Sequence, residues 1–193
     1  MRGFNASSEL LHYPGSPAIA AKILGATHRL QVFELHPDEL SRLGAWAGRD
    51  RRIKVQQADG FSALKAILPP LEKRALVMID PPYEVKSDYD AAIAALEVGR
   101  QKFATGVYAL WYPLLDRDDV SAFVKRLEKM SVKSLLVEFP VQSMMGEGMR
   151  GSGMFIVNPP WTLQQQLEVC LPYLHAALAE PGAAVWSLRS QGE

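Results

Sequence analysis

ALVMIDPPY, residues 75–83, is the most informative stretch of this 193-residue sequence. Residues 75–79 form an uninterrupted apolar run, which predicts a β-strand covered on both faces. The run ends at Asp80, and the two prolines that follow restrict the backbone to a stiff turn. Because open α/β sheets bind ligands at the carboxyl ends of their strands, this acidic turn is a candidate ligand site.

Strand-like and helix-like segments alternate on both sides of this stretch. Short apolar runs bounded by turn residues predict further strands at residues 30–34, 53–59, 107–111, 134–139, 154–157 and 183–188. Apolar residues at helical spacing predict helices at residues 18–24, 38–46, 61–68, 87–103, 120–127 and 161–178. The alternation predicts a single α/β domain over residues 1–193 with a mainly parallel sheet.

Local patterns also predict how individual helices begin and pack. Ser87-Asp88-Tyr89-Asp90 has the spacing of a capping box, and Ser16 before Pro17 has the pattern of a helix N-cap. Cys170, the single cysteine, lies on the apolar side of the helix at residues 161–178, which predicts a buried packing thiol. One cysteine excludes an internal disulfide and favours a reducing, cytoplasmic setting.

The Asp80 turn carries groups that suit methylation of an aromatic amine. An amino group on a purine is a poor nucleophile because its lone pair is delocalised into the ring. Acceptors at the Asp80 carboxylate and the Pro81 carbonyl would bind its two hydrogens and stabilise the positive charge that develops during methyl attack. Tyr83 offers a ring on which an extruded base can stack, and a sulfonium methyl donor requires no metal. The competing interpretation is a rigid strand-end turn with a buried tyrosine.

A second tetrapeptide, Asn158-Pro159-Pro160-Trp161, has a similar composition and also follows a predicted strand. It directly precedes the long helix at residues 161–178, where prolines fit the first turn. Only one further strand is predicted after it. We interpret this tetrapeptide as structural, with Trp161 packed against the sheet.

Acidic residues end two earlier predicted strands. A carboxylate such as Glu34 at a strand end commonly accepts hydrogen bonds from the hydroxyls of a cofactor ribose. Asp59 can accept an adenine amino group, and the adjacent Gly60 backbone N–H can reach a ring nitrogen. Ser16, before an apolar helix, is placed facing the same cofactor cleft. A single strand-end acid is common, but three successive predicted strands end in one here, with Asp80 as the third, and together they indicate a ligand site.

The bulk composition limits the function classes. The 21 Lys and Arg balance the 21 Asp and Glu, so net charge does not indicate a nucleic-acid partner. The local basic clusters are interpreted as solvated faces. No apolar run reaches the roughly 18 residues of a membrane span, and no His, Cys or Asp group has the spacing of metal ligands, so no metal is predicted. His28 and His36 are interpreted as surface or packing residues.

Taken together, these motifs resemble the bacterial 23S rRNA adenine-N6 methyltransferases of the RlmJ family. The resemblance runs in order over nearly the whole chain. The matching segments are Tyr13-Pro14-Gly15-Ser16-Pro17, Glu34-Leu35-His36-Pro37, Ala58-Asp59-Gly60-Phe61, Ile79-Asp80-Pro81-Pro82-Tyr83-Glu84, Phe103-Ala104-Thr105-Gly106, Ala109-Leu110-Trp111-Tyr112-Pro113, Ser152-Gly153-Met154 and Asn158-Pro159-Pro160-Trp161.

The resemblance implies a Rossmann-like class I fold with an antiparallel last strand, S-adenosylmethionine (SAM) as cofactor, and 23S rRNA as partner, naked or in early assembly. It implies no membrane or metal and leaves the oligomeric state open. Asp80 would be the catalytic acceptor and would also contact SAM. The other SAM-binding residues would be Ser16, Glu34, Asp59 and Gly60, and the substrate-binding residues Pro81, Tyr83 and Lys86. The tetrapeptide at residues 158–161 would be a second, non-catalytic copy.

The sequence departs from the family pattern at its start. Family members begin with a first strand, a glycine-rich turn and a further SAM-contacting histidine, and we find none of these before residue 30. We therefore expect a truncated domain with weak or absent SAM binding that is inactive alone. Two alternatives stay open: a related methyltransferase acting on DNA adenine or protein glutamine, although Asp80 favours a nucleobase, or a non-enzymatic fragment of the same fold.

Overall fold

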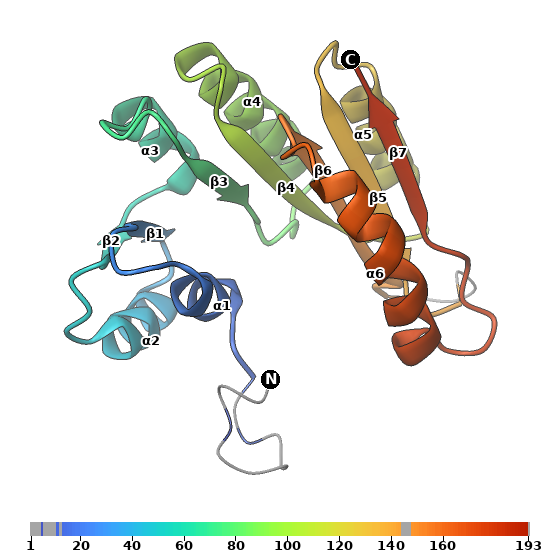
Figure 1. Cartoon of the computed structure of the whole chain (residues 1–193), viewed down its shortest axis with the longest axis horizontal. Helices are drawn as coiled ribbons and strands as arrows, with labels where there is room; N and C mark the ends of the chain where they lie inside the picture. The colour runs from blue at the N-terminus through green and yellow to red at the C-terminus, as the bar shows by residue number, and fades with distance from the viewer. Residues whose placement is uncertain (1–4, 6–10, 12, 144–147, 193) are drawn as a thin grey trace. The chain divides into compact units, whose positions relative to one another are not determined.

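The structure is a computed structural model that describes residues 5, 11, 13–143 and 148–192 (Figure 1). Its contacts divide the chain into two compact units, Met1–Ala63 and Leu64–Glu193. Each unit contains its own β-sheet. Among the described residues, no helix combines the length and apolar character that a membrane crossing requires.

The first unit is built on two parallel strands. β1 (Leu30–Glu34) and β2 (Ile53–Gln57) pair along their whole length. α1 (Ser16–Ile23) precedes β1, and α2 (Pro37–Ala47) connects the two strands. The predicted strand–helix–strand order is confirmed here, with β2 ending two residues before the predicted acid Asp59.

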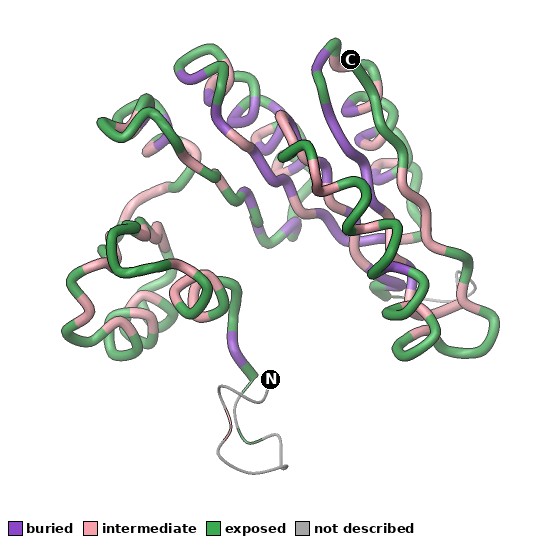
Figure 2. Tube along the Cα trace, viewed as in Figure 1, coloured by how far each residue is buried: buried purple, intermediate pink, exposed green. Residues whose placement is uncertain are grey.

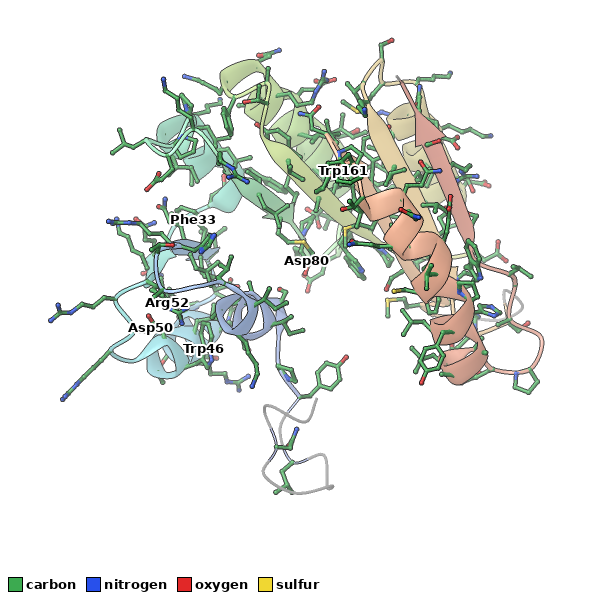
Figure 3. All side chains as sticks on the ribbon, viewed as in Figure 1. Phe33, Trp46, Asp50, Arg52, Asp80 and Trp161 are labelled. Carbon is green, nitrogen blue, oxygen red and sulfur yellow. The ribbon has the colours of Figure 1, made fainter. Side chains whose placement is uncertain are left out.

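Arg52 holds the first unit together where α1 leads toward the sheet. Its Nη1 donates to the Leu24 carbonyl oxygen at 2.8 Å, just after α1, and its Nη2 donates to Asp50 Oδ2 at 2.6 Å. The Arg52 hydrogen bonds hold the pKa of the Asp50 carboxyl below its usual range. Figure 3 shows Asp50 and Arg52 next to each other in this unit. Arg52, expected on a solvated basic face, is therefore half-buried and paired.

The second unit contains a five-stranded sheet in the order β3-β4-β6-β5-β7 (Figure 1). α3 (Gly60–Ile67) begins in the first unit and ends in the second. The remaining elements are β3 (Leu76–Ile79), α4 (Ser87–Lys102), β4 (Val107–Leu114), α5 (Asp118–Glu128), β5 (Ser134–Pro140), β6 (Gly151–Val157), α6 (Leu163–Leu178) and β7 (Ser187–Gln191).

Strand direction in this sheet agrees with the predicted fold class and refines it. β3, β4 and β5 run in one direction, and β6 and β7 run in the other. The last strand is antiparallel, as predicted. The strand inserted between two parallel ones, however, is β6, which pairs antiparallel with both β4 and β5, whereas β7 lies at the sheet edge beside β5. β7 also begins at Ser187 rather than at the predicted residue 183.

The core of the second unit lies between the sheet and helices α4 and α5, and Figure 2 shows buried residues concentrated along the central strands. The largest enclosed side chains include Tyr108, Tyr112, Phe123 and Phe155. The α4 backbone approaches the sheet closely at Gly99, where a Cβ atom would lie 2.6 Å from Tyr108 Cε1. The face of α5 that packs on the core consists of Val120, Phe123 and Leu127, which are buried.

The interpretation of α6 and the residues before it was wrong in two respects. α6 packs on β5 and β7, and Leu171 is its single buried residue. Cys170 is exposed instead of buried. Trp161 is 90% exposed and does not pack against the sheet, because the helix begins only at Leu163 and leaves the indole outside its packed face (Figure 3).

β3 is also less covered than its apolar sequence predicted. Ile79 is buried, but Leu76 is 69% exposed and Met78 43% exposed. The physical reason is its position, because β3 is an edge strand that pairs only with β4 in the described sheet. The apolar run predicted the strand correctly and its burial on both faces incorrectly.

Candidate active site

The Asp-Pro-Pro-Tyr turn lies at the carboxyl edge of the second unit's sheet. β3 pairs in parallel with β4, and its last residue, Ile79, is opposite Leu110. Asp80 follows directly (Figure 3). Tyr83, with φ of 54°, folds the chain back so that its hydroxyl donates to the Trp111 carbonyl oxygen at 2.5 Å. The turn is thus fastened to the neighbouring strand one residue beyond the last β3–β4 pair.

Asp80 presents an unengaged carboxylate. Its side chain is exposed at the turn, and neither this carboxylate nor the Pro81 carbonyl accepts a hydrogen bond or ion pair from any residue that the structure describes. Desolvation by the surrounding protein raises the pKa of Asp80. Asp80 is exposed and Pro81 is buried, and neither acceptor is used by the described part of the protein.

Tyr83 does not have the predicted role. It is only 6% exposed, and its ring packs against Tyr89, Trp111 and Phe123 at centroid distances of 4.7, 6.1 and 6.2 Å. Burial raises the pKa of its hydroxyl far above the usual range. Because both the ring and the hydroxyl are used inside the protein, the assignment of Tyr83 as a platform for an extruded base is corrected to an anchor of the turn.

Lys86 lies at the entrance to α4. It is exposed, and with Arg117, Asp118 and Asp119 it lines a shallow depression. The predicted capping box is not formed, because α4 begins at Ser87 with Lys86 at the N-cap and no side-chain cap. A longer contact replaces it, in which the Val85 N–H donates to Asp88 Oδ2 at 3.3 Å.

The second tetrapeptide has its amide occupied. Asn158 Nδ2 donates to the carbonyl oxygens of Ala104 and Gly106 at 2.7 and 2.8 Å, and its backbone N–H donates to the Lys133 carbonyl at 2.9 Å. Asn158 adopts φ of 51°, a conformation that asparagine tolerates better than most residues. These contacts join the end of β6 to the segment before β4, which agrees with a structural interpretation.

The acids of the first unit differ in how far they are engaged. Glu34 ends β1 half-buried, and its Oε1 accepts from the His36 N–H at 2.8 Å. Asp59 accepts from the Phe61 N–H at 3.0 Å and from the N–H and hydroxyl of Ser62 at 3.2 and 2.5 Å. The Ser62 hydrogen bond lowers the pKa of Asp59. Asp59 is therefore the N-terminal cap of α3. The sequence signal for this role is the Asp directly before the helix with Ser62 three residues later.

The remaining predicted cofactor residues are at helix starts. Gly60 is the first residue of α3, and a Cβ there would lie 3.6 Å from Phe33 Cβ, an ordinary contact. Ser16 is the exposed first residue of α1, where Gly15 is the N-cap and no side chain caps the helix. The N-cap assignment of Ser16 was therefore wrong, because the helix begins one residue earlier than Pro17 suggested.

The predicted site residues are distributed over both units. Ser16, Glu34, Asp59 and Gly60 belong to the first unit, whereas the turn at residues 80–83 and Lys86 belong to the second.

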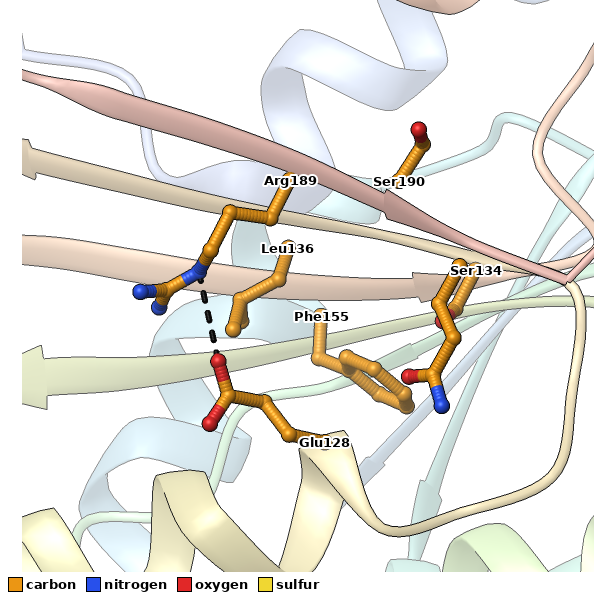
Figure 4. A pocket seen from close by; sticks show the side chains of 7 residues that line it. Glu128, Ser134, Leu136, Phe155, Arg189 and Ser190 are labelled. Atoms are coloured by element: carbon orange, nitrogen blue, oxygen red, sulfur yellow. Dashed lines mark ion pairs between the residues drawn. The ribbon is translucent and has the colours of Figure 1, made fainter.

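A separate pocket lies in the second unit at the opposite edge of the sheet from Asp80 (Figure 4). It is bordered by the end of α5 and the first residue of β5, Ser134. An ion pair of 3.3 Å between Arg189 Nε and Glu128 Oε1 spans one side. Its charged groups are paired, and it lies away from the carboxyl ends of the strands where such sheets bind ligands.

The sheet order and the acidic turn after a parallel strand define a Rossmann-like fold of the SAM-dependent methyltransferase type. The family model described as ribosomal RNA large subunit methyltransferase D, RlmJ, matches residues 1–189, and the chain belongs to this family.

Comparison with known proteins agrees with this membership. The chain is 43% identical over 184 residues to ribosomal RNA large subunit methyltransferase J of Escherichia coli K12, covering 94% of this chain and 66% of that protein. It is 42% identical over 182 residues to the protein of the same name from Haemophilus influenzae, covering 93% of this chain and 65% of that protein. The chain therefore spans about two thirds of the length of these curated relatives.

Solved structures show the same fold. A Legionella pneumophila protein superposes with a TM-score of 0.92 at 35% identity, covering 100% of this chain and 72% of that one. A probable spermidine synthase from Corynebacterium glutamicum superposes with a TM-score of 0.55 at 14% identity, covering 91% of this chain and 62% of that one. The second likeness concerns the fold alone.

Proposed function

We propose that this chain carries the catalytic acceptor site of an rRNA methyltransferase that transfers a methyl group from SAM to the exocyclic N6 of an adenine in 23S rRNA. The observation that carries the proposal is the pair of unengaged acceptors at Asp80 and Pro81, in a chain that belongs to the RlmJ family. The substrate is naked or early-assembly rRNA in the cytoplasm.

Asp80 and Pro81 prepare the amine for attack. The Asp80 carboxylate and the Pro81 carbonyl oxygen each accept one N6 hydrogen, which favours a pyramidal nitrogen with a localised lone pair. As the new N–C bond forms and the methyl–sulfur bond breaks, positive charge develops on nitrogen beside the fixed carboxylate. The nitrogen then loses one proton to Asp80 or to water. The turn supplies these acceptors without large rearrangement because Tyr83 and two prolines hold it.

Residues of the first unit suit the cofactor to different degrees. SAM supplies the electrophilic methyl group when bound. Glu34 Oε2 has no hydrogen bond from the described residues, so it can accept one from a ribose hydroxyl. Asp59 already accepts three hydrogen bonds, so its further capacity is small. The Gly60 N–H, in the first turn of α3, has no intrahelical acceptor and can donate to a ring nitrogen. Ser16 remains assigned to the same ligand.

The test is methyl transfer from radiolabelled SAM to separated rRNA, DNA and protein. The assay uses the chain extended to the full length of its curated relatives. We expect label in rRNA, a loss of at least about a hundredfold for Asp80→Ala, and retained activity for Asn158→Ala measured on folded protein. Label confined to DNA or to protein would instead identify one of the related amine methyltransferases. The outcome that contradicts the catalytic assignment is an active Asp80→Ala variant together with an inactive but folded Asn158→Ala variant.

A further inference from the structure

Arg150 is a buried cation without a partner. The residue is only 7% exposed, and its Nε and Nη2 atoms are fully enclosed without a hydrogen bond. It forms no ion pair within the part of the chain that the structure describes. The proposed transfer step at Asp80 and Pro81 does not involve this side chain.

The backbone fixes Arg150 in place. Its N–H donates to the Leu114 carbonyl oxygen at 2.8 Å, and its own carbonyl oxygen accepts from Val141 and Gln142 at 2.8 and 3.0 Å. At the next residue, Gly151, any Cβ would overlap the Phe139 backbone. The backbone around Arg150 is therefore held between the ends of β4 and β5.

This arrangement is costly unless an anion completes it. A guanidinium stays protonated in proteins, and burying an unpaired ion costs on the order of several kcal/mol. Unsatisfied buried groups are rare in native proteins, and a bound ion is one of the explanations for them. Nε and Nη2 lie on the same side of the guanidinium, so their N–H groups form the two-pronged fork that binds a phosphate or carboxylate with two parallel hydrogen bonds.

Arg150 also lies at the edge of the sheet that carries Asp80. Leu114 and Pro140, which flank it, are the last residues of β4 and β5, and Asp80 follows the last residue of β3. Arg150 is two strands from β3 and about four residues further along, which places the two Cα atoms on the order of 15 Å apart. A ligand that reaches both residues must be extended, as a polynucleotide is.

We infer that Arg150 binds a backbone phosphate of the nucleic-acid substrate, a few nucleotides from the base held at Asp80. The inference rests on the proposed function and adds a positioning contact to it. Because Nε and Nη2 are enclosed, a phosphate reaches them only through a local opening. A free phosphate ion lacks the other contacts that offset this opening, so the site favours a polymer.

The test compares Arg150→Met and Arg150→Lys with a matched control, Arg126→Met. Arg126 is half-exposed and pairs with Asp90, so its substitution removes the same charge from the protein without touching the carboxyl edge. Binding of a labelled single-stranded RNA is measured without SAM over a series of salt concentrations. The melting temperature of each variant is measured with and without inorganic phosphate.

We expect Arg150→Met to bind RNA about 3- to 10-fold more weakly at low salt and to reduce the slope of log K against log salt by about 0.7, the effect of one phosphate contact on a single strand. Arg150→Lys retains the slope but binds a few-fold more weakly, because an ammonium lacks the fork. Arg126→Met matches the parent. Without RNA, Arg150→Met melts at the same or a higher temperature, since an unpaired buried charge has been removed.

Three results would overturn the inference. An unchanged affinity and slope for Arg150→Met exclude a phosphate contact. A large loss of melting temperature in both Arg150 variants without RNA assigns a structural partner to the guanidinium. Stabilisation of the parent but not of Arg150→Met by inorganic phosphate assigns the site to a free anion. The proposed function has a separate test. If no methyl group is transferred to RNA while Arg150→Met still weakens RNA binding, the proposed function fails and the phosphate contact stands.

Discussion

The Tyr83 hydroxyl donates a 2.5 Å hydrogen bond to the backbone carbonyl of Trp111, so the turn at residues 80–83 is fastened to the adjacent parallel strand. Trp111 follows Leu110, the residue paired with the end of β3. The bond therefore fixes the height of the turn relative to the sheet edge.

Tyr83→Phe should lower the free energy of unfolding by about 1 kcal/mol, because the half-buried carbonyl oxygen of Trp111 loses its donor. We expect the rate of methyl transfer to fall as well, since the Asp80 carboxylate is less well positioned. Urea denaturation and kcat measurements check both effects. Tyr173→Phe is the control, because Tyr173 is 75% exposed on α6. A Tyr83→Phe variant with parental stability and parental kcat would contradict the anchoring role of the hydroxyl.

Asp80→Asn should abolish most activity without destabilising the protein. Desolvation raises the pKa of Asp80 above its ordinary value of 3.8, so the charged form is disfavoured in the folded state. The folded state is therefore destabilised at pH values above the raised pKa of Asp80. This destabilisation disappears at pH values below the ordinary pKa, where the carboxyl is protonated in both states. We therefore expect Asp80→Asn to melt at the same or a higher temperature at pH 7, with the difference vanishing near pH 3.

The same shift predicts the pH dependence of the parent enzyme. Transfer should decline as the pH falls through the raised pKa, because a protonated carboxyl is a poorer acceptor for the amine hydrogens. Melting temperatures and transfer rates between pH 3 and pH 8 provide the comparison. Greater stability of the parent than of Asp80→Asn at pH 7 would show that the carboxylate has a stabilising partner.

Asn158→Ala should be a stability variant rather than a catalytic one. Its amide satisfies two carbonyl oxygens, of Ala104 and Gly106, and their loss should cost about 1–3 kcal/mol. Asn158→Gly should be less destabilised than the alanine variant, because glycine adopts the observed φ of 51° without strain. Denaturation midpoints rank the variants, and the reverse order would contradict the backbone argument.

Gly153→Ala should destabilise the second unit by at least about 1–3 kcal/mol, because overpacking forces neighbouring groups to shift. A Cβ at Gly153 would overlap the ring of the buried Tyr112. The matched control is Gly44→Ala in the middle of α2, where a Cβ meets nothing within 4 Å. That substitution should stabilise by about 0.5–1 kcal/mol through helix propensity. Similar effects at both positions would mean that β6 and β4 approach less closely than described.

The sequence predicted where strands and helices lie better than it predicted how the strands are ordered and how closely they pack. Apolar runs located β1, which ends at Glu34, and β3, which Asp80 follows directly, because such runs are local patterns. The structure ends β2 at Gln57, two residues before Asp59. The insertion of β6 between β4 and β5 was not predicted, because strand order depends on pairings between residues far apart in the chain. The close approach at Gly151 and Gly153 requires small residues there, but only the paired strands reveal why.

At the candidate site, residue types were easier to predict than orientations. The predicted acceptors at Asp80 and Pro81 are not used by other described residues. The hydrogen bonds of Asn158 agree with its structural interpretation. The ring of Tyr83 was placed wrongly, because an aromatic after a turn can point to solvent or to the core, and Tyr89 and Phe123 decide between them. Arg150 was not singled out, since burial of a single arginine leaves no periodic signal.

The thin packing of the first unit has a thermodynamic consequence. No residue of α1 or α2 is buried, whereas α4 alone buries six residues, including Tyr89 and Leu96. Backbone amides in α1 and α2 should therefore exchange with deuterated solvent through opening events much less costly than global unfolding, while those in β4 and β5 are protected to the limit set by global stability. Unfolding of this chain is then a staged process. A single denaturation midpoint would describe only the second unit, which is the more stable part.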